Sequence, residues 1–227
     1  MGETHWCAPL RPGLVTGLQE EARVAARLGP ARAGGGLPAG AAAAAEQLVT
    51  AGATALVSFG LCGGLDPALP AGSLLVPHRV LDRGESFEAD RKLAEALGGP
   101  GAETLAAADR PVARVAAKRA LFLATGAAAV DLESGAVARV AARHGLPFAV
   151  LRAVCDPATL DLPPLALAAL DAGGRLRPWR MAASLAGRPD QIPGLLALAR
   201  GAAAARAALI GRVGNVLGRG GAGGAVA

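Results

Sequence analysis

Residues 128–135 read AAVDLESG and residues 147–156 read PFAVLRAVCD, and these two stretches decide the fold of the chain. Each is an apolar, strand-like run that leads to an acid, Glu133 in the first and Asp156 in the second. A helix-like segment at residues 134–144 lies between them. Units of this kind join neighbouring parallel strands, and open α/β sheets bind ligands beyond the carboxyl ends of their strands. We therefore expect Glu133 and Asp156 to share one pocket, where two carboxyls suit a sugar or a nucleoside.

The composition is that of a soluble α/β protein with one core. The chain has 227 residues, 52% of them hydrophobic but only 3% aromatic, and it contains no Tyr. Alanine, leucine and valine must therefore fill the interior. We expect a single domain over residues 1–217 and a glycine-rich, disordered tail over residues 218–227.

The chain is basic, with a net charge of +5 and a pI near 10. Nearly all of the positive charge is arginine, scattered along the chain and not interleaved with aromatic residues, which argues against a nucleic-acid surface. Two readings stay open. The arginines reflect a coding bias toward Ala, Gly and Arg, or they give a weak attraction to anionic lipid and a peripheral membrane contact.

The cysteines and termini indicate the compartment. Cys7, Cys62 and Cys155 are far apart and odd in number, which fits a reducing cytoplasm without a disulfide framework. The sequence has no CxxC or HxxxH pair, so we expect no metal site and no cofactor. It has no signal peptide and no apolar run long enough to span a membrane, so we expect a cytoplasmic protein without a transmembrane segment.

Hydrophobic patterning predicts alternating strands and helices. Strands are expected at residues 13–16, 54–59, 73–77, 79–81 and 104–108, and helices at 19–28, 39–50, 87–97 and 115–125. Further helices are expected at 165–170, 179–185 and 191–213. The glycines of residues 60–64 predict a loop that lets the backbone approach a ligand. These glycines do not form a GxGxxG motif followed by a helix, and this disfavours a dinucleotide-binding fold.

Four motifs in order carry a resemblance to a known family: GLQEE at 17–21, SFGLCGGL at 58–65, VDLES at 130–134 and RAVCD at 152–156. Together they resemble the superfamily of purine nucleoside phosphorylases and methylthioadenosine/S-adenosylhomocysteine nucleosidases, over roughly residues 13–160. The resemblance implies a three-layer α/β/α fold with a central mixed, partly barrel-like sheet. It also implies a homo-oligomer.

A narrower resemblance rests on longer runs, SFGLCGGLDPALPAGSLLVP at 58–77, LPFAVLRAVCDPATLDLPP at 146–164 and RPDQIP at 188–193. These are similar to the hopanoid-associated members of the superfamily, which are associated with removing adenine from adenosylhopane. The substrate so implied is a purine nucleoside with a large apolar 5′ group.

The resemblance also implies site residues. Asp156 matches the acid that protonates N7 of the leaving adenine, and Glu133 matches the ligand of the ribose 2′- and 3′-hydroxyls. Glu21 matches the acid that orients the attacking water. The alternative for each is simple capping or helix-start chemistry. Leu132 sits where the family usually has Met and would pack under the sugar.

Other positions complete the expected pocket. Gly60, Leu61, Cys62 and Gly63 would face the sugar and the nucleophile, with Leu61 where related nucleosidases commonly have Ser. The purine would lie near Pro111 and Val112, where an aromatic residue is usual.

Two further charged side chains, Arg152 and Asp131, belong to the same motifs. Arg152 could pair with Glu21, bind phosphate, or form a buried structural ion pair. Asp131 is expected to point away from the pocket, because neighbouring side chains of a strand alternate.

The nucleophile separates two enzyme classes. Phosphorolysis needs cationic or hydroxyl groups around a dianion, and the GLQEE run carries acids and no Arg, which favours hydrolysis. Arg32 and Arg83 remain possible phosphate ligands. The sequence thus predicts cleavage of an adenine nucleoside at its N-glycosidic bond. A methylthioadenosine/S-adenosylhomocysteine nucleosidase, a phosphorylase, and a purine nucleoside-binding module without turnover stay open.

Overall fold

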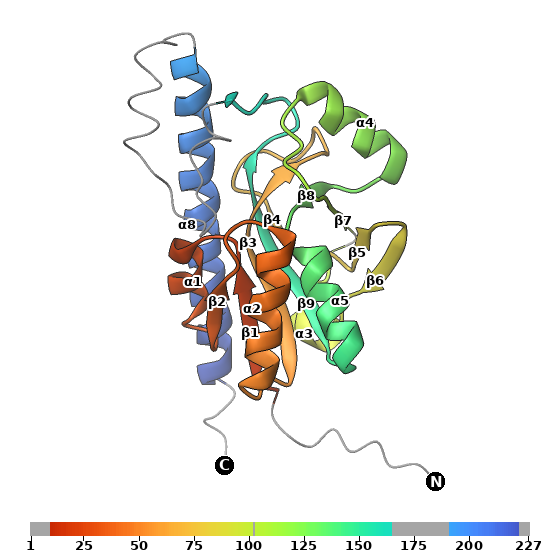
Figure 1. The fold of residues 1–227 in the computed structure, drawn as a ribbon. Helices are drawn as coiled ribbons and strands as arrows, with labels where there is room; N and C mark the ends of the chain where they lie inside the picture. The colour runs from red at the N-terminus through yellow and green to blue at the C-terminus, as the bar shows by residue number, and fades with distance from the viewer. Residues whose placement is uncertain (1–9, 102, 165–190, 223–227) are drawn as a thin grey trace.

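The computed structural model describes residues 10–101, 103–164 and 191–222, which form one mixed sheet with helices around it (Figure 1). The strands are β1 (Pro12–Thr16), β2 (Ala31–Ala33), β3 (Ala55–Gly64), β4 (Leu74–Leu75), β5 (Arg79–Asp82), β6 (Glu85–Glu88), β7 (Thr104–Ala107), β8 (Ala129–Asp131) and β9 (Phe148–Asp156). The helices are α1 (Gln19–Ala25), α2 (Pro38–Thr50), α3 (Arg91–Ala96), α4 (Val115–Thr125), α5 (Ser134–His144) and α8 (Ile192–Ala222).

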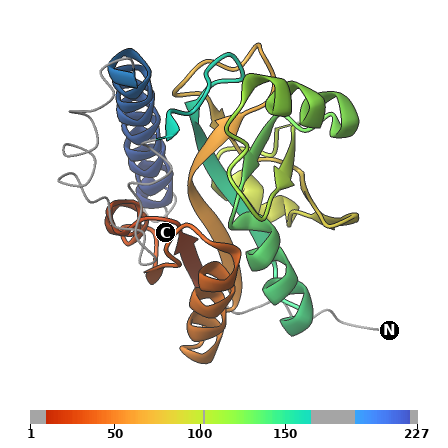
Figure 2. The same cartoon turned by 45° about the horizontal axis from the view of Figure 1, so that its top comes forward.

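Helices cover both faces of the sheet, as Figures 1 and 2 show. On one face α2 and α5 pack through Leu48 and Val137 against sheet residues such as Val150. On the other face α1, α3 and α8 supply a second cluster, in which Leu93 and Leu209 meet the sheet. The two clusters bury apolar side chains on both sides of the strands, which is the arrangement expected of an α/β layer fold. The predicted fold class is therefore confirmed.

β3 is the strand on which the sheet branches. It pairs in parallel with β1 on one side and with β9 on the other, and its last residues pair antiparallel with β8. The register with β9 shifts between Cys62 and Gly63. The extra residue at this shift is Cys155 of β9, and beyond it Gly63 pairs with Asp156 of β9 on one side and with Val130 of β8 on the other, so both partners end near the same point.

The prediction that β8 and β9 are neighbouring parallel strands is wrong. β3 lies between them, and it is antiparallel to β8 but parallel to β9. The parallel neighbour of β8 is β7. Pairing order depends on long-range contacts, which the local pattern of a strand–helix–strand unit does not contain. Glu133 and Asp156 still come together, because Gly63 of β3 pairs with Val130 near the end of β8 and with Asp156 at the end of β9.

Three further expectations need correction. Residues 60–64 are the second half of β3 and not a loop. Residues 87–97 hold the end of β6 and the short helix α3, where one helix was expected. The three-residue β2 was missed, because so short a strand carries no periodicity.

α5 has the predicted bounds and fixes the position of Glu133. Glu133 is the residue before its first turn, and the helix ends at Gly145 with a φ of 61°. This left-handed conformation favours glycine and is a common helix end. The buried face of α5 packs on the sheet, so the start of the helix is held against the end of β8.

The C-terminal helix α8 lies along the edge of the molecule and packs on β9 (Figure 1). It runs to Ala222, five residues into the segment expected to be a disordered tail. Ile192–Gly218 is long and apolar enough to cross a membrane by length and composition alone. The helices expected at 165–170 and 179–185 lie outside the described residues.

Candidate active site

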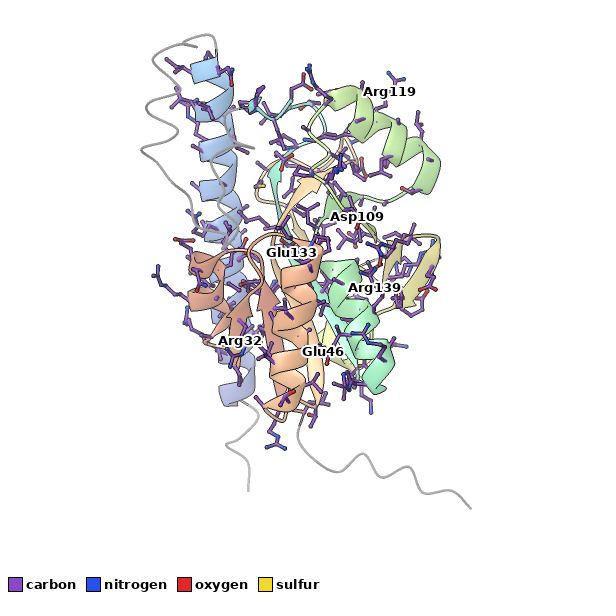
Figure 3. All side chains as sticks on the ribbon, in the orientation of Figure 1. Arg32, Glu46, Asp109, Arg119, Glu133 and Arg139 are labelled. Carbon is purple, nitrogen blue, oxygen red and sulfur yellow. The ribbon has the colours of Figure 1, made fainter. Side chains whose placement is uncertain are left out.

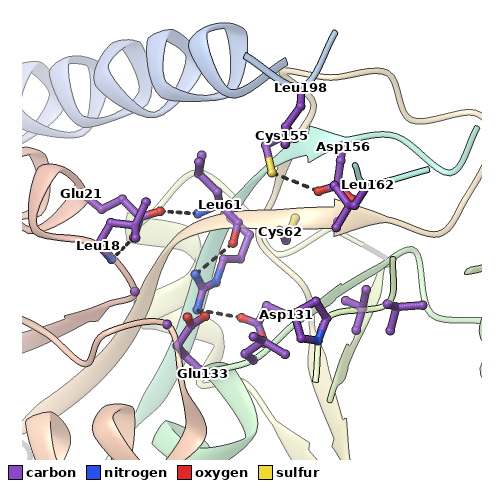
Figure 4. Close-up of a pocket in the computed structure, with 18 residues that line it drawn as sticks. Leu18, Glu21, Leu61, Cys62, Asp131, Glu133, Cys155, Asp156, Leu162 and Leu198 are labelled. Carbon is purple, nitrogen blue, oxygen red and sulfur yellow. Dashed lines mark hydrogen bonds and ion pairs between the residues drawn. The ribbon is translucent and has the colours of Figure 1, made fainter. Parts of the chain in front are cut away.

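A cavity of about 240 Å³ opens at the ends of β3 and β9. Glu133 and Asp156 both line it, as do Glu21 and Arg152 (Figure 4). The other predicted site residues that line it are Leu61, Cys62, Gly63, Pro111, Val112 and Leu132. Segments far apart in the sequence thus meet at one point, as the four motifs predict.

Gly60 is the one predicted site residue that does not line the cavity. It makes room for two residues that do. A Cβ at position 60 would lie 2.8 Å from Arg152 Nη1 and 2.8 Å from Glu21 Oε2, and the φ of Gly60 is 149°. A side chain there would displace one of these charged groups, so the glycine acts through them.

The Arg152 guanidinium is the centre of a buried ionic cluster. Its Nη2 lies 2.7 Å from Asp131 Oδ2 and 3.0 Å from Glu133 Oε2, and the Arg152 side chain is 1% exposed. It also donates to Ser58 Oγ at 2.7 Å and to the Leu61 carbonyl at 3.1 Å. Of the roles left open for Arg152, the structure shows a buried ion pair, formed with Asp131 and Glu133 and not with Glu21.

Asp131 belongs to this cluster and does not point away from the pocket. It lines the cavity and accepts hydrogen bonds from the Ser134 backbone N–H and side-chain hydroxyl. β8 ends at Asp131, so the strict alternation of a strand no longer governs the residues that follow. Both acids of the DLE run therefore reach Arg152.

Burial raises the proton affinity of two acids in the cavity wall, Glu133 and Glu21. Burial raises the pKa of Glu133 to about 7, where Arg152 opposes the rise and the charges of Asp131 and Glu21 add to it. Burial also raises the pKa of Glu21, against the effect of Arg152. Arg152 itself is penalised by burial, but its acidic neighbours raise its pKa above the ordinary value. The cluster thus keeps its cation, while Glu133 and Glu21 bind their protons more tightly than they would in water.

Glu21 lies at the start of α1 and is held by backbone donors. Its Oε2 accepts from the Leu18 N–H at 2.8 Å and its Oε1 from the Leu61 N–H at 3.0 Å. The first contact is helix capping, as the alternative reading held. The second joins α1 to β3 and fixes the carboxylate in the cavity wall. A carboxylate oxygen has two lone pairs, so both oxygens can still accept a further hydrogen bond.

Asp156 lies at the far end of the cavity from Glu133 (Figure 4). Its Oδ2 lies 2.7 Å from Lys118 Nζ, and its Oδ1 accepts from the Cys155 thiol at 3.0 Å. Burial raises the pKa of Asp156, while Lys118 acts in the opposite direction. Burial also raises the pKa of the Cys155 thiol well above its usual value, so this cysteine is no reactive thiolate.

Lys118 is the neighbour that the sequence reasoning missed. It is completely buried on α4 and contacts no other side-chain carboxylate than Asp156 among the described residues. One signal was available, because Lys118 and Lys92 are the only lysines in an arginine-rich chain. No spacing rule links residue 118 to residue 156.

The basic residues suggested as phosphate ligands lie elsewhere. Arg32 is on β2, away from Glu133 (Figure 3), and Arg83 pairs with Asp109 at the surface at 2.8 Å. Neither lines the cavity. Within the part of the chain that the structure describes, no group of three or more His, Cys, Asp or Glu side chains could hold a metal ion.

The rest of the wall is apolar and comes from several elements. Pro111 and Val112 precede α4, Leu162 follows β9, and Leu198 belongs to α8. The cavity is therefore divided between a charged end, with Glu21, Arg152 and Glu133, and an end where Asp156 lies among aliphatic side chains. This division suits a ligand with a polar sugar and an apolar flat base or tail.

Residues 23–103 and 102–168 match the sequence profile of the Phosphorylase superfamily, which is more than half of the chain. The chain belongs to this superfamily. It is therefore an enzyme of the nucleosidase or phosphorylase kind. A search of curated protein sequences finds no significant match.

Solved structures of similar fold are nucleosidases and a hydrolase. One is 5′-methylthioadenosine/S-adenosylhomocysteine nucleosidase from Neisseria meningitidis with methylthio-immucillin-A, at 17% identity and a TM-score of 0.65 over 92% of this chain and 99% of that one. S-adenosylhomocysteine nucleosidase from Streptococcus pyogenes has 19% identity and a TM-score of 0.61, covering 67% and 86% of the two chains. A futalosine hydrolase mutant from Helicobacter pylori has 16% identity and a TM-score of 0.57, covering 64% and 89%. At these identities the likeness is one of fold.

Proposed function

We propose that this chain hydrolyses the N-glycosidic bond of an adenine nucleoside. One observation carries the proposal. A single cavity holds a buried acid near each end, Asp156 and Glu133, with the carboxylate of Glu21 in the wall beside Leu61. These are the groups needed to protonate a departing base, hold a ribose and activate a water molecule.

Asp156 supplies the proton in this mechanism. Burial raises its pKa, which favours the protonated form that a general acid needs. The proton passes from the carboxyl to adenine N7, the C1′–N9 bond breaks, and its electron pair leaves with the base. The sugar is left with an oxocarbenium-like positive charge at C1′.

The ionised carboxylate of Glu133 holds the sugar. A carboxylate accepts hydrogen bonds from both ribose hydroxyls, and its charge stabilises the cation that forms at C1′. Arg152 keeps the Glu133 side chain in one orientation through the 3.0 Å ion pair. Leu132 lies beside Glu133 in the cavity wall and packs under the ribose.

Glu21 orients the water that attacks C1′. It is fixed by two backbone N–H groups, and Gly17 leaves space between it and Glu133, since a Cβ at position 17 would lie 2.7 Å from Glu133 Oε1. The raised pKa of Glu21 suits a base that takes one proton from water. Addition of the hydroxyl to C1′ completes the hydrolysis.

Water is favoured over phosphate by the charges of the wall. The described lining residues include four acids, Glu21, Asp131, Glu133 and Asp156, and one base, Arg152. Arg152 is already paired with two carboxylates. A phosphate dianion would face net repulsion in this site, whereas water would not.

The nucleophile is tested by measuring adenine release with and without inorganic phosphate. We expect equal rates and free ribosyl product in both. Strict dependence on phosphate, with a ribosyl 1-phosphate as product, would contradict hydrolysis and make the enzyme a phosphorylase.

Adenosylhopane is the substrate we propose, with ribosylhopane and adenine as products in hopanoid biosynthesis. The longer sequence resemblance supports it. The cavity, at about 240 Å³, is smaller than the roughly 300–1,000 Å³ of most drug-sized ligand sites. A space of this size suits the nucleoside alone, so a large 5′ group would extend beyond it past Leu162 and Leu198.

The same small cavity favours a second candidate, methylthioadenosine or S-adenosylhomocysteine, whose 5′ groups are compact. A screen of adenine release from adenosylhopane, methylthioadenosine and S-adenosylhomocysteine, with hypoxanthine release from inosine measured beside it, separates the two. We expect the highest kcat/KM for adenosylhopane. Release of adenine from none of them, with nucleoside binding retained, would make the protein a binding module.

A further inference from the structure

We infer that Lys118 is a positioning residue that confines the transferable proton of Asp156 to its Oδ1 oxygen. The inference rests on the proposed function, in which Asp156 is the general acid. It concerns a residue from α4, a helix that otherwise lies at the rim of the molecule.

Lys118 occupies an unusual position for its residue type. It is the one residue of α4 that is buried, at 0% side-chain exposure, while the other residues of the helix are half-buried or exposed. A peripheral helix normally buries an apolar residue at such a point. A fully buried lysine is rare unless it is paired. The burial of Lys118 therefore implies that its charge has a specific partner.

The partners of the ammonium group are all acceptors at the end of β9. Nζ lies 2.7 Å from Asp156 Oδ2, 2.9 Å from the Pro157 carbonyl and 3.0 Å from the Leu160 carbonyl, with the Asp156 carbonyl at 3.3 Å. The three N–H bonds of an ammonium are thus all used. Lys118 holds the Asp156 carboxyl and the segment that follows it in one arrangement.

This arrangement distinguishes the two oxygens of Asp156. An ammonium can donate hydrogen bonds but cannot accept one. Oδ2 accepts from Lys118 at 2.7 Å, and a proton placed on Oδ2 would make it a poorer acceptor for the ammonium. Oδ1 has the Cys155 thiol as its neighbour, at 3.0 Å, and a thiol can turn its proton away and accept instead. Oδ1 is therefore the oxygen that can carry the proton.

The same contact sets the strength of the acid. Burial alone would make Asp156 a reluctant acid, since its charged form would lie in an apolar wall. Lys118 stabilises the carboxylate that remains after the proton has gone to the base, and it lowers a pKa that burial raises. A general acid works best when its pKa lies near the operating pH. Lys118 thus opposes the effect of burial on the pKa of Asp156.

A second set of contacts ties this acid to the base-binding wall. The Val115 N–H donates to Asp161 Oδ1 at 2.6 Å, and the Leu162 N–H donates to the Ala113 carbonyl at 2.8 Å. The start of α4 and the segment after β9 are therefore joined at several points, among which the contacts of Lys118 are the buried ones. Pro111, Val112 and Leu162 sit on the joined segments, so loss of Lys118 alters the acid and its distance from the base.

The test is the pH profile of kcat/KM for adenine release by Lys118→Met, which keeps the side-chain volume and removes the charge. Activity needs protonated Asp156, so the profile falls on its alkaline side at the pKa of that group. Without Lys118 the carboxylate is less stable, and we expect this limb to move up by one pH unit or more, with kcat reduced at least tenfold. Lys92→Met is the matched control, since Lys92 is exposed and the wild-type profile should be retained.

Lys118→Gln, which keeps N–H donors without the charge, replaces the methionine variant if that does not fold, and the same shift is expected. A lower kcat with an unmoved alkaline limb would overturn the inference, since a merely structural lysine would act in that way.

A titration of the Asp156 carboxyl by carbon NMR, assigned with Asp156→Asn, separates this result from the proposed function. If the intact protein releases no adenine, the proposed function fails, and the titration still decides the role of Lys118. A pKa of Asp156 that is higher in the variant supports it, and an unchanged pKa rejects it.

Discussion

Arg152 Nη2 lies 3.0 Å from Glu133 Oε2 at the floor of the cavity, and the two side chains are 1% and 8% exposed. They come from β9 and from the start of α5, so the contact joins the two stretches that first indicated the fold. The pair is completed by Asp131, at 2.7 Å from the same nitrogen. A ribose bound to Glu133 would therefore rest on a carboxylate that the arginine holds in place.

Replacing Arg152 by Met should destabilise the fold strongly. Removing one partner of a buried ion pair leaves uncompensated charge, at a cost of about 3–5 kcal/mol in the free energy of unfolding. The loss should be smaller at pH 5 than at pH 8, because protonation of Glu133, whose pKa is raised to about 7, relieves it. Urea unfolding at both pH values measures this. Arg143→Met, which removes an exposed pair with Glu46, should cost no more than about 1 kcal/mol. Equal losses in the two variants would contradict the ionic role of Arg152.

The free energy of unfolding should fall as pH rises from about 4.5 to 7. Glu133 has an ordinary pKa of 4.5 and a folded pKa of about 7, so between these values the folded state holds a proton that the unfolded state has lost. Stability then falls with increasing pH. Glu133→Gln should remove part of this slope, on the order of 1–3 kcal/mol across the window. The raised pKa values of Glu21 and Asp156 supply slope of the same sign. Parallel curves for wild type and variant would show that Glu133 does not titrate in this range.

Asp156→Asn should abolish adenine release while nucleoside binding survives. The amide fills the same space but has no acidic proton, and loss of a general acid typically costs about 10²–10⁴ in rate. Adenine release and calorimetric binding of the same nucleoside measure the two effects. Asp109→Asn, at an exposed aspartate paired with Arg83, is the control and should leave both unchanged. Activity near the wild-type level in Asp156→Asn would remove it from the mechanism.

Glu133→Ala should lose discrimination for the ribose 2′-hydroxyl. A hydrogen bond to a charged group contributes about 1.5–3 kcal/mol, so wild type should prefer adenosine over 2′-deoxyadenosine about tenfold or more in kcat/KM. In the variant the two substrates should become nearly equal, because the acceptor is gone. A preference that persists undiminished would place the sugar ligand elsewhere.

The sequence alone was sufficient for the elements whose signal is local. α5 is amphipathic and followed by Gly145, and its bounds were predicted from residue 134 to residue 144. The apolar run that ends at Asp156 is likewise β9. Ten of the eleven predicted site residues line the cavity, because the motifs that hold them sit at the ends of strands, where α/β sheets form their sites.

Features set by long-range contacts could not be predicted. The order of β8, β3 and β9 depends on pairing between segments about 65 residues apart or more, and the extra residue of β9 at Cys155 has no local signature. The contact between Lys118 and Asp156 arises only when α4 folds over the end of β9. The glycines at residues 60–64 were misread as a loop for a related reason. At Gly60 the missing side chain leaves space for Glu21 and Arg152, which are distant in the sequence.

Gly60→Ala is the change that tests this last point. The added Cβ would lie 2.8 Å from both Arg152 Nη1 and Glu21 Oε2, and two charged, buried groups cannot both move away. We expect a loss of stability larger than the roughly 1–2 kcal/mol that a positive φ costs a non-glycine residue, together with a large drop in kcat. Gly52→Ala is the matched control, because Gly52 also has a positive φ of 90° but has open space around its Cβ position. Thermal unfolding and adenine release of the two variants isolate the effect of the contact. If both variants behave alike, position 60 requires glycine only for its backbone conformation. The space needed by Glu21 and Arg152 would then not be the reason for the glycine.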